Sequence, residues 1–305
     1  LKLDFSEKSL NVQRNVVCEE FKEHYINRPY GDVWHILRKL VYEKHPYQWP
    51  TIGLELQHVQ DATLTDVENF FYKYYRPNNA ILTISGGISA DNALQLAKKW
   101  FGDIPSGEPF NRNIAMEPEQ QAAKFQHVKK DVPVNVIYKA WKMPGRIEPL
   151  YYATNLLSDV LGLGESSRLQ HALKKETKLF TDIAAYITGS IDTGMFIITG
   201  KLAEGITYEQ AEQGIQQELD KIKQAPITDA ELTRVKNTVE MDIASNNTGV
   251  MNKAEMLAIA EMLESADLVN TEIHRYLNVD AASIHTIAQQ LLTAEKCSTL
   301  YYGKD

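Results

Sequence analysis

The chain has 305 residues, and at about 150 residues per domain this length predicts two domains rather than one. With 32 Lys and Arg against 40 Asp and Glu, the formal net charge is −8, which argues against a nucleic-acid-binding protein, because such a protein needs a basic face for the phosphates. The only two cysteines, Cys18 and Cys297, exclude a disulfide scaffold and a cysteine-based zinc module, and are equally compatible with a periplasmic or a cytoplasmic location. No apolar run reaches the roughly 18 residues of a membrane-spanning helix.

The chain begins at Leu1 without an initiator Met, and we therefore expect it to be truncated at its N-terminus.

The first third of the chain is mainly helical in its pattern. Apolar spacing, caps and breakers predict helices over 7–26, 31–42, 63–74 and 91–101, with Thr63 or Thr65 as the N-cap of the third. Residues 80–85 are predicted to form a strand, closed by two glycines. A Pro- and Gly-rich stretch follows, and we assign 106–125 as an interdomain linker.

The remaining residues mix strands and helices. Strands are predicted over 132–141, 179–189, 195–202 and 297–302; helices are predicted over 149–161, 168–176, 207–223, 228–245, 253–264, 268–277 and 281–292. The glycines and serines of 162–167 are typical of a turn that leads into a helix. The whole pattern predicts an α+β protein.

The chain also contains an internal repeat. The helix around 67–71 and the strand that ends at Gly86 parallel the helix around 284–288 and the strand that ends at Gly303. Two similarly folded domains are therefore expected, in which residues 1–88 correspond to about 228–305. The counterpart of 126–227 would then be missing from the front, so we expect the first domain to lack its N-terminal part.

One group of residues has the composition of a metal site. Glu20, Glu23 and His24 stand at positions i, i+3 and i+4, which share one face of an α-helix. This group is one residue short of the H-x-x-E-H motif, in which two histidines hold zinc and the Glu activates a water. On spacing alone a solvated helix face is favoured over a metal site. The aromatic residues of 70–75 are interpreted as core and rim, and lone histidines such as His45 as surface or hydrogen-bonded core residues.

The order of several segments resembles a known peptidase family. These segments are Gln13–Glu20, Pro29–Asp32, His45–Gly53, Tyr74–Ala80 with Gly86-Gly87, and Ser166–Leu169. Together they resemble the M16 (pitrilysin/insulinase-like) zinc metallopeptidases, specifically the bacterial M16B branch related to mitochondrial processing peptidase. The resemblance extends over essentially the whole chain and implies two similar α+β domains, each a sheet covered by helices. The expected division is 1–105 for the C-terminal part of the first, zinc-binding domain, 106–125 for the linker and 126–305 for the second domain.

The resemblance also implies roles for single residues. It makes Glu20 the third zinc ligand and places Gln13 where the family has an acidic residue that supports the site, whereas Glu23 and His24 match no catalytic position. The H-x-x-E-H motif does not occur in the 305 residues, so the general base is expected in the missing N-terminal part. A substrate-binding Arg and Tyr of the family fall on Lys174 and Thr181.

The implied activity is that of a Zn²⁺-dependent endopeptidase acting on peptides or unfolded polypeptide segments. The chain as given is expected to be inactive alone, and to form a homodimer or a heterodimer with another M16 subunit. The alternatives are a non-catalytic structural M16-like subunit and a peptide-binding module that needs no metal.

Overall fold

The computed structural model describes residues 5–109 and 112–304, which form two compact units. Unit 1 consists of Leu1–Asp32, Trp49–Ala115 and Asn246–Val269. Unit 2 consists of Val33–Gln48, Met116–Ser245 and Asn270–Asp305. The chain therefore passes between the units several times, and each unit includes residues from distant parts of the sequence. The domain boundaries 1–105, 106–125 and 126–305 stay a prediction.

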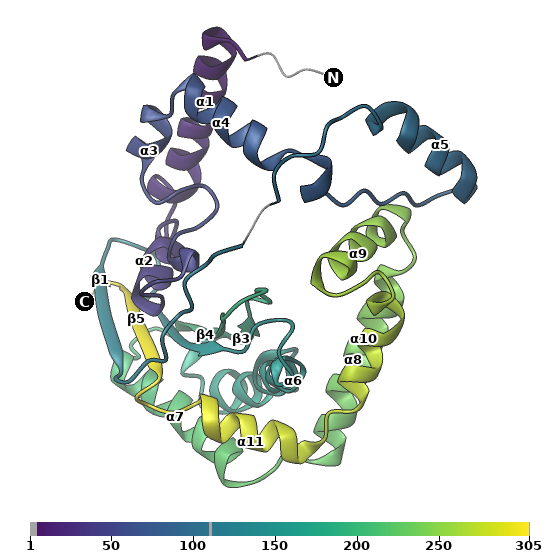
Figure 1. Cartoon of the computed structure of the whole chain (residues 1–305). Helices are drawn as coiled ribbons and strands as arrows, with labels where there is room; N and C mark the ends of the chain where they lie inside the picture. The colour runs from purple at the N-terminus through teal and green to yellow at the C-terminus, as the bar shows by residue number, and fades with distance from the viewer. Residues whose placement is uncertain (1–4, 110–111, 305) are drawn as a thin grey trace. The chain divides into compact units, whose positions relative to one another are not determined.

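The regular elements described in unit 1 are all helices (Figure 1). Its helices are α1 (Glu7–Phe21), α3 (Leu56–Asp61), α4 (Leu64–Tyr74), α5 (Ala90–Phe101) and α9 (Val250–Leu263). The third expected helix has Thr63 as its N-cap, in a capping box in which Thr63 and Asp66 exchange hydrogen bonds. The hydroxyls of Ser6 and Ser89 cap α1 and α5 by accepting from the backbone N–H groups of Ser9 and Asn92.

The strand predicted over residues 80–85 is wrong, because these residues are extended but form no strand in the structure. A strand exists only where the backbone N–H and C=O groups of a neighbour accept and donate its hydrogen bonds. No strand lies among the described residues of unit 1, so this segment has no such neighbour. Its apolar side chains are correspondingly exposed, with Leu82 at 57%.

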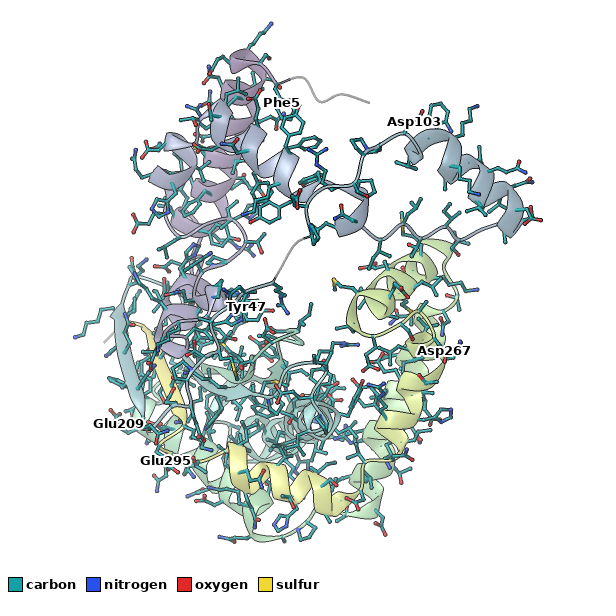
Figure 2. The ribbon with its side chains drawn as sticks, in the orientation of Figure 1. Phe5, Tyr47, Asp103, Glu209, Asp267 and Glu295 are labelled. Atoms are coloured by element: carbon teal, nitrogen blue, oxygen red, sulfur yellow. The ribbon has the colours of Figure 1, made fainter. Side chains whose placement is uncertain are left out.

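The aromatic residues of α4 are likewise not core residues. Phe70, Tyr72 and Tyr75 are each more than half exposed, and neither α4 nor α5 has a buried residue. The interpretation of 70–75 as core and rim is therefore wrong for the described part of unit 1. The physical reason is the same: in the described part of unit 1 no strand packs on α4, and the ring of Phe5 is what lies against Phe71, with 5.3 Å between the ring centres (Figure 2).

Unit 2 is built on one five-stranded mixed sheet. Its strands are β1 (Lys124–Lys129), β2 (Val136–Met143), β3 (Phe180–Ile187), β4 (Gly194–Leu202) and β5 (Cys297–Gly303), in the order β1-β5-β2-β4-β3. β1 pairs with β5 in parallel, and the other neighbours are antiparallel. The sequence pattern missed β1, which is a short edge strand with a Lys at each end, a composition that discourages further pairing.

Helices cover the sheet of unit 2. Those that pack on its strands are α2 (Val33–Val41), α6 (Tyr151–Gly162), α7 (Tyr208–Gln224) and α11 (Ala281–Leu291). The unit also includes α8 (Asp229–Asn246) and α10 (Leu268–Leu277). Ile137 and Trp141 of β2 belong to the main core with α6, α7 and α11. α2 packs on β1, β2 and β5 through a face that buries Val33, Leu37 and Val41. The M16-like α+β architecture, a mixed sheet covered by helices, is thus present in unit 2 (Figure 1).

Among the described residues, no helix is long and apolar enough to cross a membrane.

Candidate functional site

The predicted zinc ligand Glu20 and its predicted supporting residue Gln13 both lie on α1. Seven residues are about two α-helical turns, so the two side chains project from the same side of the helix. Both are exposed. Val12 and Val16 are 53% and 55% exposed and stand about two turns and about one turn before Glu20, respectively. The helix therefore presents Glu20 at the end of an exposed apolar stripe.

Glu23 and His24 follow Glu20 in a different kind of helix. Lys22–Ile26 form a π-helical turn, in which the N–H of Asn27 donates to the carbonyl of Lys22 at 2.8 Å. The extra residue in this turn removes the i, i+3, i+4 register that an α-helix would have given the three side chains.

The described residues do not form a complete metal site. No group of three or more His, Cys, Asp or Glu side chains in 5–109 or 112–304 comes together closely enough to hold an ion. Zinc sites in proteins use at least three protein ligands, so Glu20 can supply one oxygen of such a site but does not fit zinc by itself. Any chemistry at zinc therefore lies beyond what these residues perform alone.

Lys174 and Thr181 lie in unit 2, on either side of the entry to β3. Lys174 belongs to a π-helical segment, Gln170–Glu176, and is partly exposed; Thr181 is exposed, and its hydroxyl donates to the carbonyl of Lys201 at 3.3 Å. Between them, Lys178 has φ 56°, a left-handed conformation that favours glycine. An ammonium group can supply a charge there, but not the two-pronged hydrogen bonding of a guanidinium.

The turn before this segment is held by an ion pair. Gly164 has φ 77° and its carbonyl accepts from the Ser167 hydroxyl at 2.7 Å. Arg168 then binds the Glu231 carboxylate at both oxygens, at 2.7 and 3.0 Å. The hydrogen bond from Arg168 is the main cause that lowers the pKa of Glu231 to about 2, although partial burial opposes it. The ion pair between Arg168 and Glu231 therefore connects the start of the segment that carries Lys174 to the first turn of α8.

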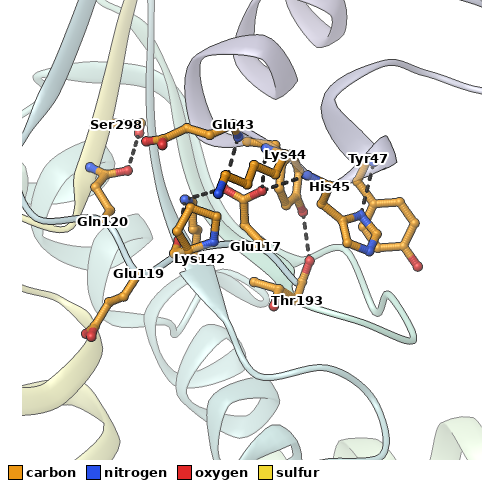
Figure 3. Close-up of polar contacts among 12 residues, drawn as sticks. Glu43, Lys44, His45, Tyr47, Glu117, Glu119, Gln120, Lys142, Thr193 and Ser298 are labelled. Atoms are coloured by element: carbon orange, nitrogen blue, oxygen red, sulfur yellow. Dashed lines mark hydrogen bonds and ion pairs between the residues drawn. The ribbon is translucent and has the colours of Figure 1, made fainter. Parts of the chain in front are cut away.

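A buried carboxylate that the sequence did not reveal fixes the loop after α2 (Figure 3). The Glu117 carboxylate accepts from the backbone N–H groups of Glu43, Lys44 and His45 at 2.9, 3.0 and 2.9 Å. It also pairs with Lys142 of β2 at 2.5 Å, and its side chain is fully buried. Burial alone would raise the pKa of Glu117, but the Lys142 ammonium and the three N–H donors outweigh it and hold the pKa at about 2.

His45 and Tyr42 complete this connection. The buried His45 ring accepts from the Tyr47 N–H at Nδ1, so its Nε2 carries the proton and donates to Asp192 at 3.1 Å. The Tyr42 hydroxyl donates to the carbonyl of Thr193 at 3.0 Å, and burial raises the pKa of this phenol. We name Glu117, Lys142, His45 and Tyr42 the α2 anchor. No local pattern could have revealed it, because Glu117 lies more than 70 residues from the loop that it binds. For His45, the structure shows a hydrogen-bonded core residue.

The comparisons with known proteins agree with this geometry. The profile of the peptidase M16 inactive domain matches residues 61–239, which is more than half of the chain. The zinc protease PqqE of Helicobacter pylori is 25% identical over 302 residues, covering 98% of this chain and 68% of PqqE. The crystal structure of a protease from Helicobacter pylori superposes with a TM-score of 0.91 at 26% identity, over 99% of this chain and 73% of that one.

A more distant relative bears on the predicted branch of the family. The mitochondrial-processing peptidase subunit beta of Saccharomyces cerevisiae is 22% identical over 244 residues, covering 75% of this chain and 52% of that subunit. The fold, the order of the segments and the matched profile are those of a peptidase M16 domain. The chain belongs to the peptidase M16 family, and the predicted resemblance to that family is confirmed.

Proposed function

We propose that this chain is part of a zinc-dependent endopeptidase that acts on peptides or unfolded polypeptide segments, with Glu20 as one zinc ligand. The observation that carries the proposal is the placement of Glu20 on the exposed stripe of α1 formed with Val12 and Val16. A zinc ligand on an exposed apolar stripe is suited to a metal site whose other ligands come from residues that pack over this helix. Gln13, on the same side, would support the site from outside the ligand set. Membership of the M16 family and similarity to a zinc protease support the proposal.

The two further ligands and the general base would come from residues outside the 305 given. The sequence contains no H-x-x-E-H, and unit 1 contains no described strand although residues 80–85 have the pattern of one. The internal repeat supports a missing layer: residues 80–85 follow the start of α4 at the same distance as β5 follows the start of α11. In unit 2 the elements of 124–227 cover α11 and β5. We propose that a similar layer covers α4, α5 and residues 80–85 in the active enzyme, and that the chain without it is inactive.

We also propose that the enzyme works as a pair of M16 subunits, in which this chain is the zinc-bearing one. Lys174 and Thr181 stand where the family binds substrate with Arg and Tyr, and neither reproduces that hydrogen bonding. A partner subunit with the Arg–Tyr pair would supply it. The alternative is a non-catalytic M16-like subunit or a peptide-binding partner; a non-catalytic subunit would not need to keep its zinc ligands, and Glu20 at the expected position counts against it.

The test compares Glu20→Gln with His24→Ala in a protein that contains both this chain and an H-x-x-E-H segment. Zinc content by inductively coupled plasma mass spectrometry and hydrolysis of a quenched fluorescent peptide are the two readouts. Glu20→Gln is expected to lower activity by about 100-fold or more, because changing even an outer-shell residue costs 10–100-fold. His24→Ala, one turn further along, should retain both zinc and activity. Equal losses in the two variants would refute the assignment of Glu20, and a protein without zinc or activity would support the non-catalytic alternative.

A further inference from the structure

A cavity of about 390 Å³ lies in unit 2, lined by residues from the first turn of α6, the end of α10 and the start of α11. Its lining includes neither Lys174 nor Thr181. Its volume is within the range of small-molecule sites, at the lower end. It is therefore a candidate site separate from the proposed peptidase function.

One wall of this cavity is apolar. Ile147 and Leu150 line it and are 54% and 42% exposed, while Val279 beside them is buried. Partly exposed aliphatic side chains around a concave surface gain free energy when an apolar group covers them. This wall fits an aliphatic or aromatic group.

The lining also carries a positive charge. Arg275 belongs to it, donates to the Tyr152 hydroxyl at 3.4 Å and lies over the Tyr152 ring at 5.8 Å. Ser283 adds a hydroxyl. The one carboxylate in the lining, Glu148, accepts from the backbone N–H of Gly145 at 2.7 Å.

A second guanidinium stands behind this part of the lining. Arg146 donates to the Tyr151 hydroxyl at 3.0 Å and pairs with Glu272 at 2.7 Å, while Glu272 lies 3.5 Å from the Tyr152 hydroxyl. Two arginines and the Glu272 carboxylate thus surround the tyrosines, and within the lining Arg275 is the cation and Glu148 the carboxylate. The positive end of the α6 dipole adds to this potential, because its first turn forms part of the lining and its N-cap, Leu150, has no capping side chain.

We infer that this cavity binds a small carboxylate with an apolar body, with the carboxylate on Arg275 and the apolar group against Ile147, Leu150 and Val279. The C-terminal residue of a peptide with an apolar side chain has this chemistry, and so does a medium-chain fatty acid. Both present one anionic group that can accept paired hydrogen bonds from a guanidinium.

The test measures binding of three probes to the 305-residue chain by isothermal titration calorimetry. The probes are N-acetyl-Leu-Phe with a free carboxylate, the same dipeptide as its C-terminal amide, and octanoate. The free acid is expected to bind at least about tenfold more tightly than the amide, since a charge-assisted hydrogen bond adds roughly a factor of ten. Tighter binding of octanoate than of the free dipeptide would identify a fatty acid as the ligand source, and the reverse would identify a peptide end.

Three variants locate the site. Arg275→Gln should lower the affinity for the free acid about tenfold, to that of the amide, and Ser283→Leu should fill the cavity and weaken both acids. Arg28→Gln, an exposed arginine of unit 1, should leave binding unchanged. Circular dichroism confirms that each variant is folded. Equal affinity for acid and amide, unchanged binding in Arg275→Gln, or no binding of any probe at millimolar concentration would each overturn the inference. Because none of these measurements involves zinc or hydrolysis, their outcome is independent of the proposed peptidase function.

Discussion

Replacing Glu117 by Gln should change the pH dependence of stability more than any exposed carboxylate can. The substitution keeps the shape of the side chain and one acceptor oxygen, but removes the charge that faces Lys142 and three backbone N–H groups. It therefore tests whether the α2 anchor is held by charge, and not merely by packing.

The size of the effect follows from the pKa of Glu117, which is lowered from 4.5 to about 2 in the folded chain. A lowered folded-state pKa contributes stability above the unfolded-state value, and this stability is lost as the pH falls through the folded-state value. The difference corresponds to about 3 kcal/mol of unfolding free energy, all of it present near pH 7. About 1.4 kcal/mol of it is lost by pH 3.5, and the remainder between pH 3.5 and pH 2 and just below.

The assay is urea unfolding followed by far-ultraviolet circular dichroism at pH 7 and pH 3.5. Glu117→Gln should lose less stability than the wild type between these pH values, by about 1.4 kcal/mol. The contribution of Glu231, which has the same sign, is common to both proteins and cancels. Glu119→Gln is the matched control, because Glu119 lies in the same segment but pairs with Lys296 on the surface. An identical loss of stability in wild type and Glu117→Gln would refute the reasoning.

Three other predictions concern the elements around the candidate site. In the same urea assay, Leu37→Ala should lower the unfolding free energy by about 2–5 kcal/mol, because Leu37 is buried in the α2 face that packs on the sheet. A loss below about 1 kcal/mol would contradict that packing. Arg168→Lys should lower the melting temperature, because an ammonium group does not bind both oxygens of Glu231 in the paired geometry of a guanidinium. An unchanged melting temperature would mean that this ion pair is not formed in solution. In hydrogen exchange followed by mass spectrometry, the amides of residues 80–85 should exchange within seconds and those of 297–303 should be protected. The reason is that only residues 297–303 have neighbouring strands in the described structure. Equal protection of the two segments would show that residues 80–85 are paired with another strand.

Local pattern was sufficient for most helices. The predicted 207–223 is observed as Tyr208–Gln224, and 281–292 as Ala281–Leu291, because an apolar stripe and a capping side chain are both encoded within a few residues. The change to a π-helix at Lys22–Ile26 was beyond this approach, since the spacing of side chains is read on the assumption of an α-helix. On the assumption of an α-helix, Glu20, Glu23 and His24 were expected to share one face.

The candidate functional residues also fall into two groups, those selected from the sequence and those found only in the structure. Glu20, Gln13, Lys174 and Thr181 were selected by the order of motifs, and their roles stay predictions. The α2 anchor and the cavity beside Arg275 were not foreseen, because each joins residues from distant segments: Glu117 with the loop at 43–45, and Arg275 with the start of α6.

The sequence by itself determined where most of the helices lie, the order of the motifs and, through them, membership of the M16 family. The tertiary structure decided which extended segments become strands. Residues 80–85 and 297–303 follow similar helices at the same distance and carry similar apolar patterns, yet only the second is a strand. β5 lies between β1 and β2, which accept and donate its backbone hydrogen bonds, whereas residues 80–85 have no such neighbours among the described residues. Strand formation depends on hydrogen bonds to a distant part of the chain, and no local pattern contains that partner.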